Sequence, residues 1–227
     1  MNFEFSDEQT MIRESLSRYL RDTYDFDARG KILASDEGWS RKTWSDLAEL
    51  GIMGAAFDES YDGFGGAPSD TLVIMEELGK ALVLEPFLPT VMLCGKLLST
   101  VGGEIASNLI GKICAGEMIM GLAHAEPKSR FSRSRVDTAA KASGDSYVLS
   151  GHKSVVLAAP IADMLIVSAR TSGELNDAAG ISLFLVDPKA KGVTLQGYRN
   201  IDGHLAGDII LDNVTASSRL GELDAGF

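Results

Sequence analysis

The chain has 227 residues, of which 45% are hydrophobic, and its 21 basic and 32 acidic side chains give a formal net charge of −11. This length allows one large domain or two small ones, and this composition can form a hydrophobic core. The negative charge argues against a nucleic-acid partner, which needs a basic surface. No apolar run reaches 18 residues, so we expect no membrane-spanning helix and no membrane partner.

The start of the chain shows no targeting segment. Residues Met1–Glu8 are acidic, and they lack the basic end and apolar stretch of a signal peptide and the arginine-rich character of a transit peptide. We therefore expect a cytoplasmic protein. Cys94 and Cys114 form neither a disulfide framework nor a metal motif, so we interpret them as buried thiols and expect no metal site.

The first half of the chain, to about residue 115, has helical spacing of its apolar residues. Ser6 and Gln9 form a capping-box pattern at the start of the first expected helix. Gly51 is expected to end a later helix as a C-terminal cap. Ser69 or Asp70 is expected to cap the helix that follows a glycine-rich loop.

After Gly116 the rhythm changes to short runs rich in β-branched residues, separated by turns. Gly144-Asp145 has the composition of a hairpin turn. The change predicts an α+β fold, with an N-terminal all-helical domain over residues 1–116 and a β-barrel-like domain over residues 117–227. The expected strands are Met118–His124, Thr138–Ser143, Tyr147–Ser150, Met164–Ala169, Ile181–Val186 and Asp208–Leu211.

Two stretches of the second half carry a family resemblance. GEMIMGLAHAEP, from Gly116 to Pro127, resembles the signature G-E-x-x-x-x-x-A-x-T-E-P that opens the middle domain of acyl-CoA dehydrogenases. YVLSGHKSVVLAAPIADMLIVSART is similar to the same family's Y-x-L-N-G-x-K-x-x-I-T-N-x-x-x-A-D-x-x-x-V-x-A-x-T. In the first half, FSDEQTMIRESLSRYL looks like the family's first helix. The resemblance spreads over the whole chain, and it implies FAD-dependent oxidation of acyl-CoA thioesters.

The resemblance also implies a third, C-terminal helical domain, and we expect this chain to lack it, because Phe227 stands where that domain would begin. In the family the catalytic glutamate lies in that domain, so we name no catalytic residue here. Glu76 and Glu77 are interpreted as helix-surface or helix-packing carboxylates, and Glu126 as a residue that holds a loop. We therefore expect this chain alone to be inactive towards acyl-CoA.

The resemblance places the cofactor at two strand ends. Mapped by adjacency, the first site consists of Leu122, His124 and Ala125, and the second of Val155, Val156 and Leu157. The family's threonines are replaced by Ala125 and Leu157, so side-chain hydrogen bonds to a flavin are lost while backbone groups remain. Two alternatives remain: the chain binds FAD weakly, or it does not bind FAD at all.

The loop after Glu126-Pro127 is the expected substrate contact. Phe131 stands roughly where the family has a serine near the thioester, and Arg130 belongs to a basic run with Lys128, Arg133 and Arg135. Arginine suits phosphate groups because its planar fork donates two parallel hydrogen bonds. The alternative is a solvated, mobile loop.

Three functions compete. The chain is an acyl-CoA dehydrogenase acting on an acyl-CoA substrate, or a flavin-deficient, non-catalytic subunit that pairs with an active relative in a homo- or hetero-oligomer. The third alternative is a ligand-binding β domain with a helical cap and no redox role. A yellow colour from bound FAD would favour the first alternative.

Overall fold

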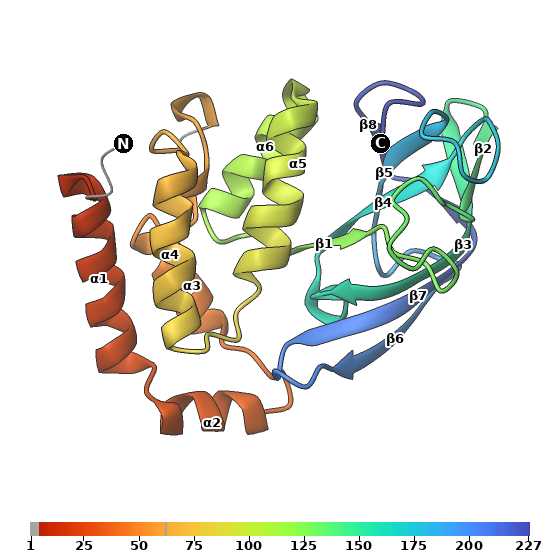
Figure 1. Ribbon diagram of the computed structural model, residues 1–227. Helices are drawn as coiled ribbons and strands as arrows, with labels where there is room; N and C mark the ends of the chain where they lie inside the picture. Colours follow the sequence, from red (N-terminus) through yellow and green to blue (C-terminus); the bar gives the residue numbers. More distant parts are fainter. Residues whose placement is uncertain (1–4, 62) are drawn as a thin grey trace.

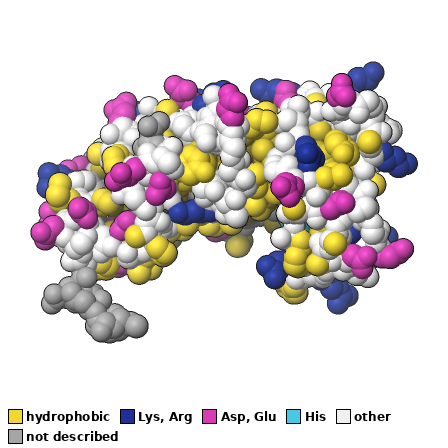
Figure 2. Space-filling view, turned by 90° about the horizontal axis from the view of Figure 1, so that it is seen from above, with side chains coloured by type: hydrophobic (Ala, Val, Ile, Leu, Met, Phe, Trp, Pro, Cys, Tyr) yellow, Lys and Arg dark blue, Asp and Glu magenta, His cyan; other side chains and the backbone are white. Residues whose placement is uncertain are grey.

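The structure is a computed structural model that describes residues 5–61 and 63–227. Met1–Glu4, the first half of the acidic start, lie outside the described residues. Helices occupy one side of the molecule and a sheet the other, as the change of periodicity predicts (Figure 1). Acidic side chains dominate over the helices on the face in Figure 2, while Lys and Arg gather over the sheet.

In the helical part, the helices begin and end largely where the local sequence signals predict. Ser6 caps the first helix: its Oγ accepts a hydrogen bond from Gln9 N–H at 3.2 Å, and Gln9 Oε1 accepts from Ser6 N–H at 3.0 Å. Gly51 follows the third helix with a φ of +75°, which glycine adopts without steric cost. The helices are α1 (Asp7–Thr23), α2 (Phe26–Ala34), α3 (Arg41–Glu49), α4 (Pro68–Lys80), α5 (Lys96–Val101) and α6 (Gly103–Cys114), with short turns η1 (Gly54–Ala56) and η2 (Glu59–Tyr61) and a π-helical segment η3 (Leu88–Gly95).

The start of α4 differs from expectation, because neither Ser69 nor Asp70 is its N-cap. Ala67 holds that position and Pro68 begins the helix, where its fixed φ suits the first turn. Asp70 lies inside the first turn, and its Oδ2 accepts a hydrogen bond from Ala67 N–H at 3.2 Å. The carboxylate therefore stabilises the helix start from within the helix.

The second half forms one eight-stranded sheet in the order β6-β7-β3-β2-β4-β5-β8, with β1 added in parallel to β4. The turn at Gly144-Asp145 joins β2 to β3, as expected. β6 and β8 are edge strands, so the sheet is open and only loosely barrel-like. The strands are β1 (Met120–Ala123), β2 (Ala139–Ser143), β3 (Ser146–Leu157), β4 (Met164–Arg170), β5 (Ile181–Val186), β6 (Val193–Arg199), β7 (Leu205–Thr215) and β8 (Ser218–Leu220), with one turn, η4 (Ala159–Ile161), between β3 and β4. In the described residues no α-helix follows Cys114, and no helix is long and apolar enough to cross a membrane.

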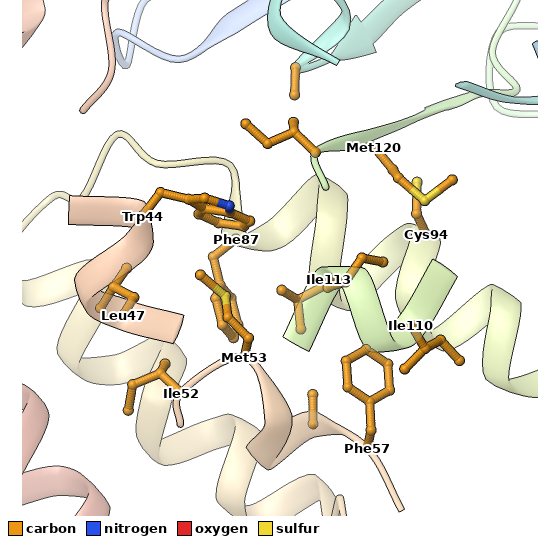
Figure 3. Close-up of a cluster of buried hydrophobic side chains, with 14 of the residues drawn as sticks. Trp44, Leu47, Ile52, Met53, Phe57, Phe87, Cys94, Ile110, Ile113 and Met120 are labelled. Atoms are coloured by element: carbon orange, nitrogen blue, oxygen red, sulfur yellow. The ribbon is translucent and has the colours of Figure 1, made fainter. Parts of the chain in front are cut away.

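Two hydrophobic cores hold the molecule together. One lies among the helices and extends to β1, where Met120 joins residues such as Trp44 and Phe87 (Figure 3). The other lies inside the curved sheet around residues such as Phe184. Because the first core contains side chains from both halves, the helices and the sheet pack as one unit.

The connection between β6 and β7 binds the sheet to the helices at a second place. Arg29 of α2 donates hydrogen bonds to the carbonyl oxygens of Leu82, at 2.7 Å, and Asp202, at 3.0 Å. His204 Nε2 lies 3.0 Å from the carbonyl oxygen of Val83. The chain after α4 is therefore held between α2 and the β6–β7 connection.

Candidate functional site

The end of β1 contributes to a buried polar cluster. His124 follows the strand, and its Nδ1 lies 2.9 Å from Ser168 Oγ on β4. Burial lowers the pKa of His124, and the positive charge of Lys153 lowers it further. The ring is therefore held as a neutral imidazole with one nitrogen already engaged.

The end of β3 is distorted. The pairing of β3 with β7 shifts register between Lys153 and Val156, which marks a β-bulge. Val155 lies in this bulge with a φ of +53°, and Ala158 follows with a φ of +60°. Positive φ is a steric outlier for a β-branched residue, and such strain concentrates at functional sites. The bulge turns Val155 outward, where 56% of it is exposed.

These two strand ends lie side by side. Ser154 N–H donates a hydrogen bond of 2.8 Å to the carbonyl oxygen of Ala125. Deeper in the sheet, a Cβ added to Gly121 would lie 3.0 Å from the carbonyl oxygen of Leu157, so β1 and β3 approach closely there. The two segments predicted to hold a cofactor therefore form one surface.

The six predicted cofactor residues are not equivalent on that surface. Ala125 and Val155 are exposed, and Leu122 and His124 are half-buried. Leu157 is half-buried and lines a cavity. Val156 is only 1% exposed and belongs to the core of the sheet, so its side chain is not available at that surface.

The loop after β1 is held by a buried ion pair. Lys153 Nζ lies 2.7 Å from Glu126 Oε1, and the same carboxylate accepts hydrogen bonds from the N–H groups of Asp137, at 2.6 Å, and Thr138, at 3.0 Å. Burial raises the pKa of Glu126, but Lys153 and these hydrogen bonds lower it overall. Burial lowers the pKa of Lys153 to about 8. This value still lies above neutral pH, so the ammonium group is mostly charged there. Glu126 closes the loop between residues 126 and 138, as expected from the sequence.

The predicted substrate residues lie in this loop and point into solvent. Phe131 is fully exposed, and Arg130 is exposed with a φ of +51°. Neither lines the cavity beside Leu157. In the same basic run, Arg133 lies over the ring of Phe227 at 5.4 Å, and Arg135 lies 3.8 Å from Asp137. The structure therefore does not bring Arg130 and Phe131 to the strand-end surface.

The cavity beside Leu157 has a volume of ≈ 110 Å³ and lies between the segment after α4, the end of β3 and the β6–β7 connection. Its lining is mostly apolar. The lining residues are Leu84, Glu85, Pro86, Leu88, Pro89, Leu157, Ala158, Ile161, Asp202, His204 and Leu205.

Three polar residues line this cavity, namely Glu85, Asp202 and His204, and none of them is identified as a site residue from the sequence. Glu85 is only 3% exposed, and the sequence signal for it was a single acid in the apolar run Val83-Leu84-Glu85-Pro86-Phe87. From the sequence, His204 is expected to be a surface or turn residue. It does lie in the β6–β7 connection, but its ring faces the helical part and its Nε2 lies close to the carbonyl oxygen of Val83. In the described residues no cluster of three His, Cys, Asp or Glu side chains could hold a metal ion.

Comparison with known proteins identifies both halves of the chain. Residues 6–130 match the family model described as "Acyl-CoA dehydrogenase, N-terminal domain". Residues 121–214 match the model described as "Acyl-CoA dehydrogenase, middle domain". Together the two matches cover both the helical part and most of the sheet.

Individual relatives are longer than this chain. A 3-(aryl)acrylate reductase of Clostridium sporogenes is 32% identical, over 80% of this chain and 50% of the relative. The mitochondrial long-chain specific acyl-CoA dehydrogenase of Rattus norvegicus is 28% identical, over 98% of this chain and 53% of the relative. The ChsE4-ChsE5 complex from Mycobacterium tuberculosis shares the fold, with a TM-score of 0.87 and 22% identity over 100% of this chain and 59% of that one. The chain thus spans about half to three-fifths of these proteins.

Proposed function

This chain belongs to the acyl-CoA dehydrogenase family, and we propose that it serves FAD-dependent α,β-oxidation of acyl-CoA thioesters as one component of a larger dehydrogenase. The observation that carries the proposal is the junction of β1 and β3. There the hydrogen bond between Ser154 and Ala125 joins the two predicted cofactor segments into one surface next to a cavity. A planar ring and an acyl group need such a surface and such a cavity.

The side chains at this surface suit the apolar face of a flavin ring but not its polar edge. Ala125, Val155 and Leu157 carry no hydrogen-bonding groups, and His124 Nδ1 already has Ser168 as its partner. A flavin bound here would accept the hydride, and the protein would orient it and tune it through hydrogen bonds. With so few side-chain donors, we expect this chain to bind FAD weakly or not at all by itself.

The residues of this chain supply binding and exclusion of water rather than the base. Glu126 is engaged by Lys153 and two backbone N–H groups, so it holds a loop instead of taking a substrate proton. Glu76 and Glu77 both pair with Arg13 and Lys80 on the helical part. We therefore expect the catalytic carboxylate to come from another segment or another polypeptide.

A second candidate is a flavin-deficient subunit that pairs with an active acyl-CoA dehydrogenase. The exposed apolar side chain of Val155 favours it, because Val155 lies at the strand-end surface, which a partner could cover. The similarity in fold to a complex of two named proteins, ChsE4 and ChsE5, is consistent with this arrangement.

The test is to purify the chain, measure the FAD it retains and assay acyl-CoA oxidation with an artificial electron acceptor. We expect a colourless protein without turnover. We expect activity only when an acyl-CoA dehydrogenase polypeptide that supplies a base and a complete flavin site is added. Turnover of any acyl-CoA by the chain alone would contradict the proposed division of labour. Failure to associate with, or raise the activity of, any such polypeptide would contradict the component role.

A further inference from the structure

Glu85 is a buried carboxyl group with one unused oxygen. Its Oε1 accepts a hydrogen bond of 3.0 Å from the backbone N–H of Ser40, the residue that caps α3. Its Oε2 is buried, with no hydrogen-bond partner among the described residues. A buried polar atom without a partner is costly, so such atoms are rare in native proteins and call for an explanation. Oε2 therefore has no partner in hydrogen-bond geometry, although the Tyr24 hydroxyl lies near this carboxyl group and opposes the rise of its pKa.

Glu85 lies between two adjoining cavities. One is the ≈ 110 Å³ cavity beside Leu157, and the other has a volume of ≈ 200 Å³ and lies mainly against α4. Glu85, Leu88 and His204 line both. The combined space compares with the cavity of about 150 Å³ that takes up benzene in an engineered protein. Leu88 and Asp202 are exposed, so the space reaches the surface.

We propose that Glu85 anchors a ligand that has an apolar body and one hydroxyl group, bound in these two cavities between the helices and the sheet. The apolar body is required by the lining, which consists mostly of Leu, Pro, Ile and Ala side chains. The hydroxyl group is inferred from Glu85 Oε2, because no described residue makes a hydrogen bond to this atom and a hydroxyl group can do so.

A hydroxyl group suits Glu85 in either protonation state. It accepts a hydrogen bond from a neutral carboxylic acid and donates one to a carboxylate. Burial is the largest influence and raises the pKa of Glu85, so the acid form persists to a higher pH than in an exposed glutamate. In that form a ketone oxygen could also accept the proton of Oε2, which makes cyclohexanone a probe of the protonation state.

If the chain has the function proposed above, the ligand is the acyl part of a thioester, and only this identity of the ligand rests on the proposed function. Leu157 lines the cavity and belongs to the predicted cofactor surface, so an acyl group in the cavity would lie next to that surface. Acyl groups that carry a hydroxyl on a ring or chain would then be preferred over plain alkyl chains. The test below needs no flavin, coenzyme A or turnover, so it can fail while the proposed function stands.

The probes are cyclohexanol and xenon, titrated into the isotope-labelled full chain while the backbone amide signals of Leu84, Ala158 and Leu205 are followed by NMR. Cyclohexanol has the size and the single hydroxyl of the proposed ligand. Xenon enters apolar cavities without hydrogen bonding, so it reports that the cavity is intact. The variants are Glu85→Gln, which keeps two polar atoms, and Glu85→Leu, which keeps the size but loses both.

We expect wild type and Glu85→Gln to bind cyclohexanol with dissociation constants within about twofold of each other, and Glu85→Leu to bind it about three- to tenfold more weakly. Xenon should shift the same signals in all three proteins. Equal cyclohexanol affinity in wild type and Glu85→Leu would overturn the proposal. The proposal would also be overturned if xenon shifted these amide signals in wild type but cyclohexanol did not. The cavity would then be accessible, and Glu85 Oε2 would not bind a hydroxyl group there.

Discussion

Lys153 Nζ and Glu126 Oε1 lie 2.7 Å apart with both side chains essentially inaccessible to solvent, and this pair ties the bulged strand β3 to the loop that follows β1. Lys153 Nζ also lies 3.2 Å from the carbonyl oxygen of His124 and 3.2 Å from Ser168 Oγ. The two strand ends of the candidate site therefore share one buried polar cluster, which couples the position of the loop to the position of the bulge.

Breaking this ion pair should destabilise the whole β domain. Lys153→Met leaves Glu126 charged and buried without its partner, which costs about 3–5 kcal/mol of unfolding free energy. Urea unfolding followed by circular dichroism measures this loss. The matched control is Lys128→Met in the same loop, where the side chain is exposed and a change of at most about 0.5 kcal/mol is expected. Equal effects of the two variants would show that the pair does not hold the loop.

Glu85 should make stability depend on pH in a defined direction. Burial raises the pKa of Glu85 in the folded protein above its ordinary value of 4.5. Between these two values the folded protein holds a proton that the unfolded chain has lost, so the free energy of unfolding falls as pH rises. Both Glu85→Gln and Glu85→Leu should therefore gain stability relative to wild type as pH rises above 4.5.

Urea unfolding of the three proteins at several pH values between about 4 and 7 measures this difference in unfolding free energy, which should grow as pH rises through that range. The loss of the Ser40 hydrogen bond in Glu85→Leu adds an offset that does not depend on pH, so the change with pH is the relevant quantity. A constant difference across the range would mean that Glu85 is ionised in the folded protein as readily as in the unfolded chain.

Restoring hydroxyl groups at the strand-end surface should raise FAD affinity. Ala125→Thr together with Leu157→Thr adds two hydroxyl groups at positions that are exposed and half-buried, worth about 1–3 kcal/mol for the pair, or roughly five- to a hundredfold in affinity. Titration with FAD, followed by flavin fluorescence in the assembly with an active partner, measures the gain.

The control for this experiment is Val156→Thr. Its side chain lies in the core of the sheet, so the added hydroxyl cannot reach a ligand and should lower stability without raising FAD affinity. A gain from Val156→Thr equal to that of the double variant would show that the effect is indirect. Tight FAD binding by the unaltered chain would show that backbone groups suffice.

The contact between α2 and the β6–β7 connection should depend on Arg29. Arg29→Met removes hydrogen bonds to the carbonyl oxygens of Leu82 and Asp202, with an expected loss of about 1–3 kcal/mol. Hydrogen exchange should become faster at residues 199–205 before the rest of the sheet responds. Arg21→Met is the control, because Arg21 forms only an exposed pair with the neighbouring Asp22 in the described contacts and such pairs contribute little. Unchanged exchange at residues 199–205 would contradict the role of Arg29.

Local signals predicted much of the secondary structure because they act over a few residues. Ser6 with Gln9 marked the start of α1. β5 has the predicted bounds Ile181–Val186, since all six of its residues are buried and five of them are apolar. α2 and β6 were missed for the opposite reason. α2 has no buried residue, and β6 is an edge strand with a largely exposed sequence, so neither carries a strong periodic pattern.

The sequence by itself determined the order of helices and sheet, the two strand ends and the family, because these depend on local periodicity and on motifs of adjacent residues. Only the tertiary structure decided which side chains meet. It joined Ser154 to Ala125, and it turned Val156 into the core and Val155 outward at a bulge. It also brought Glu85 and His204, 119 positions apart in the chain, to the same cavity. Burial and pairing of this kind arise from contacts between distant segments, and no local pattern in the sequence encodes them.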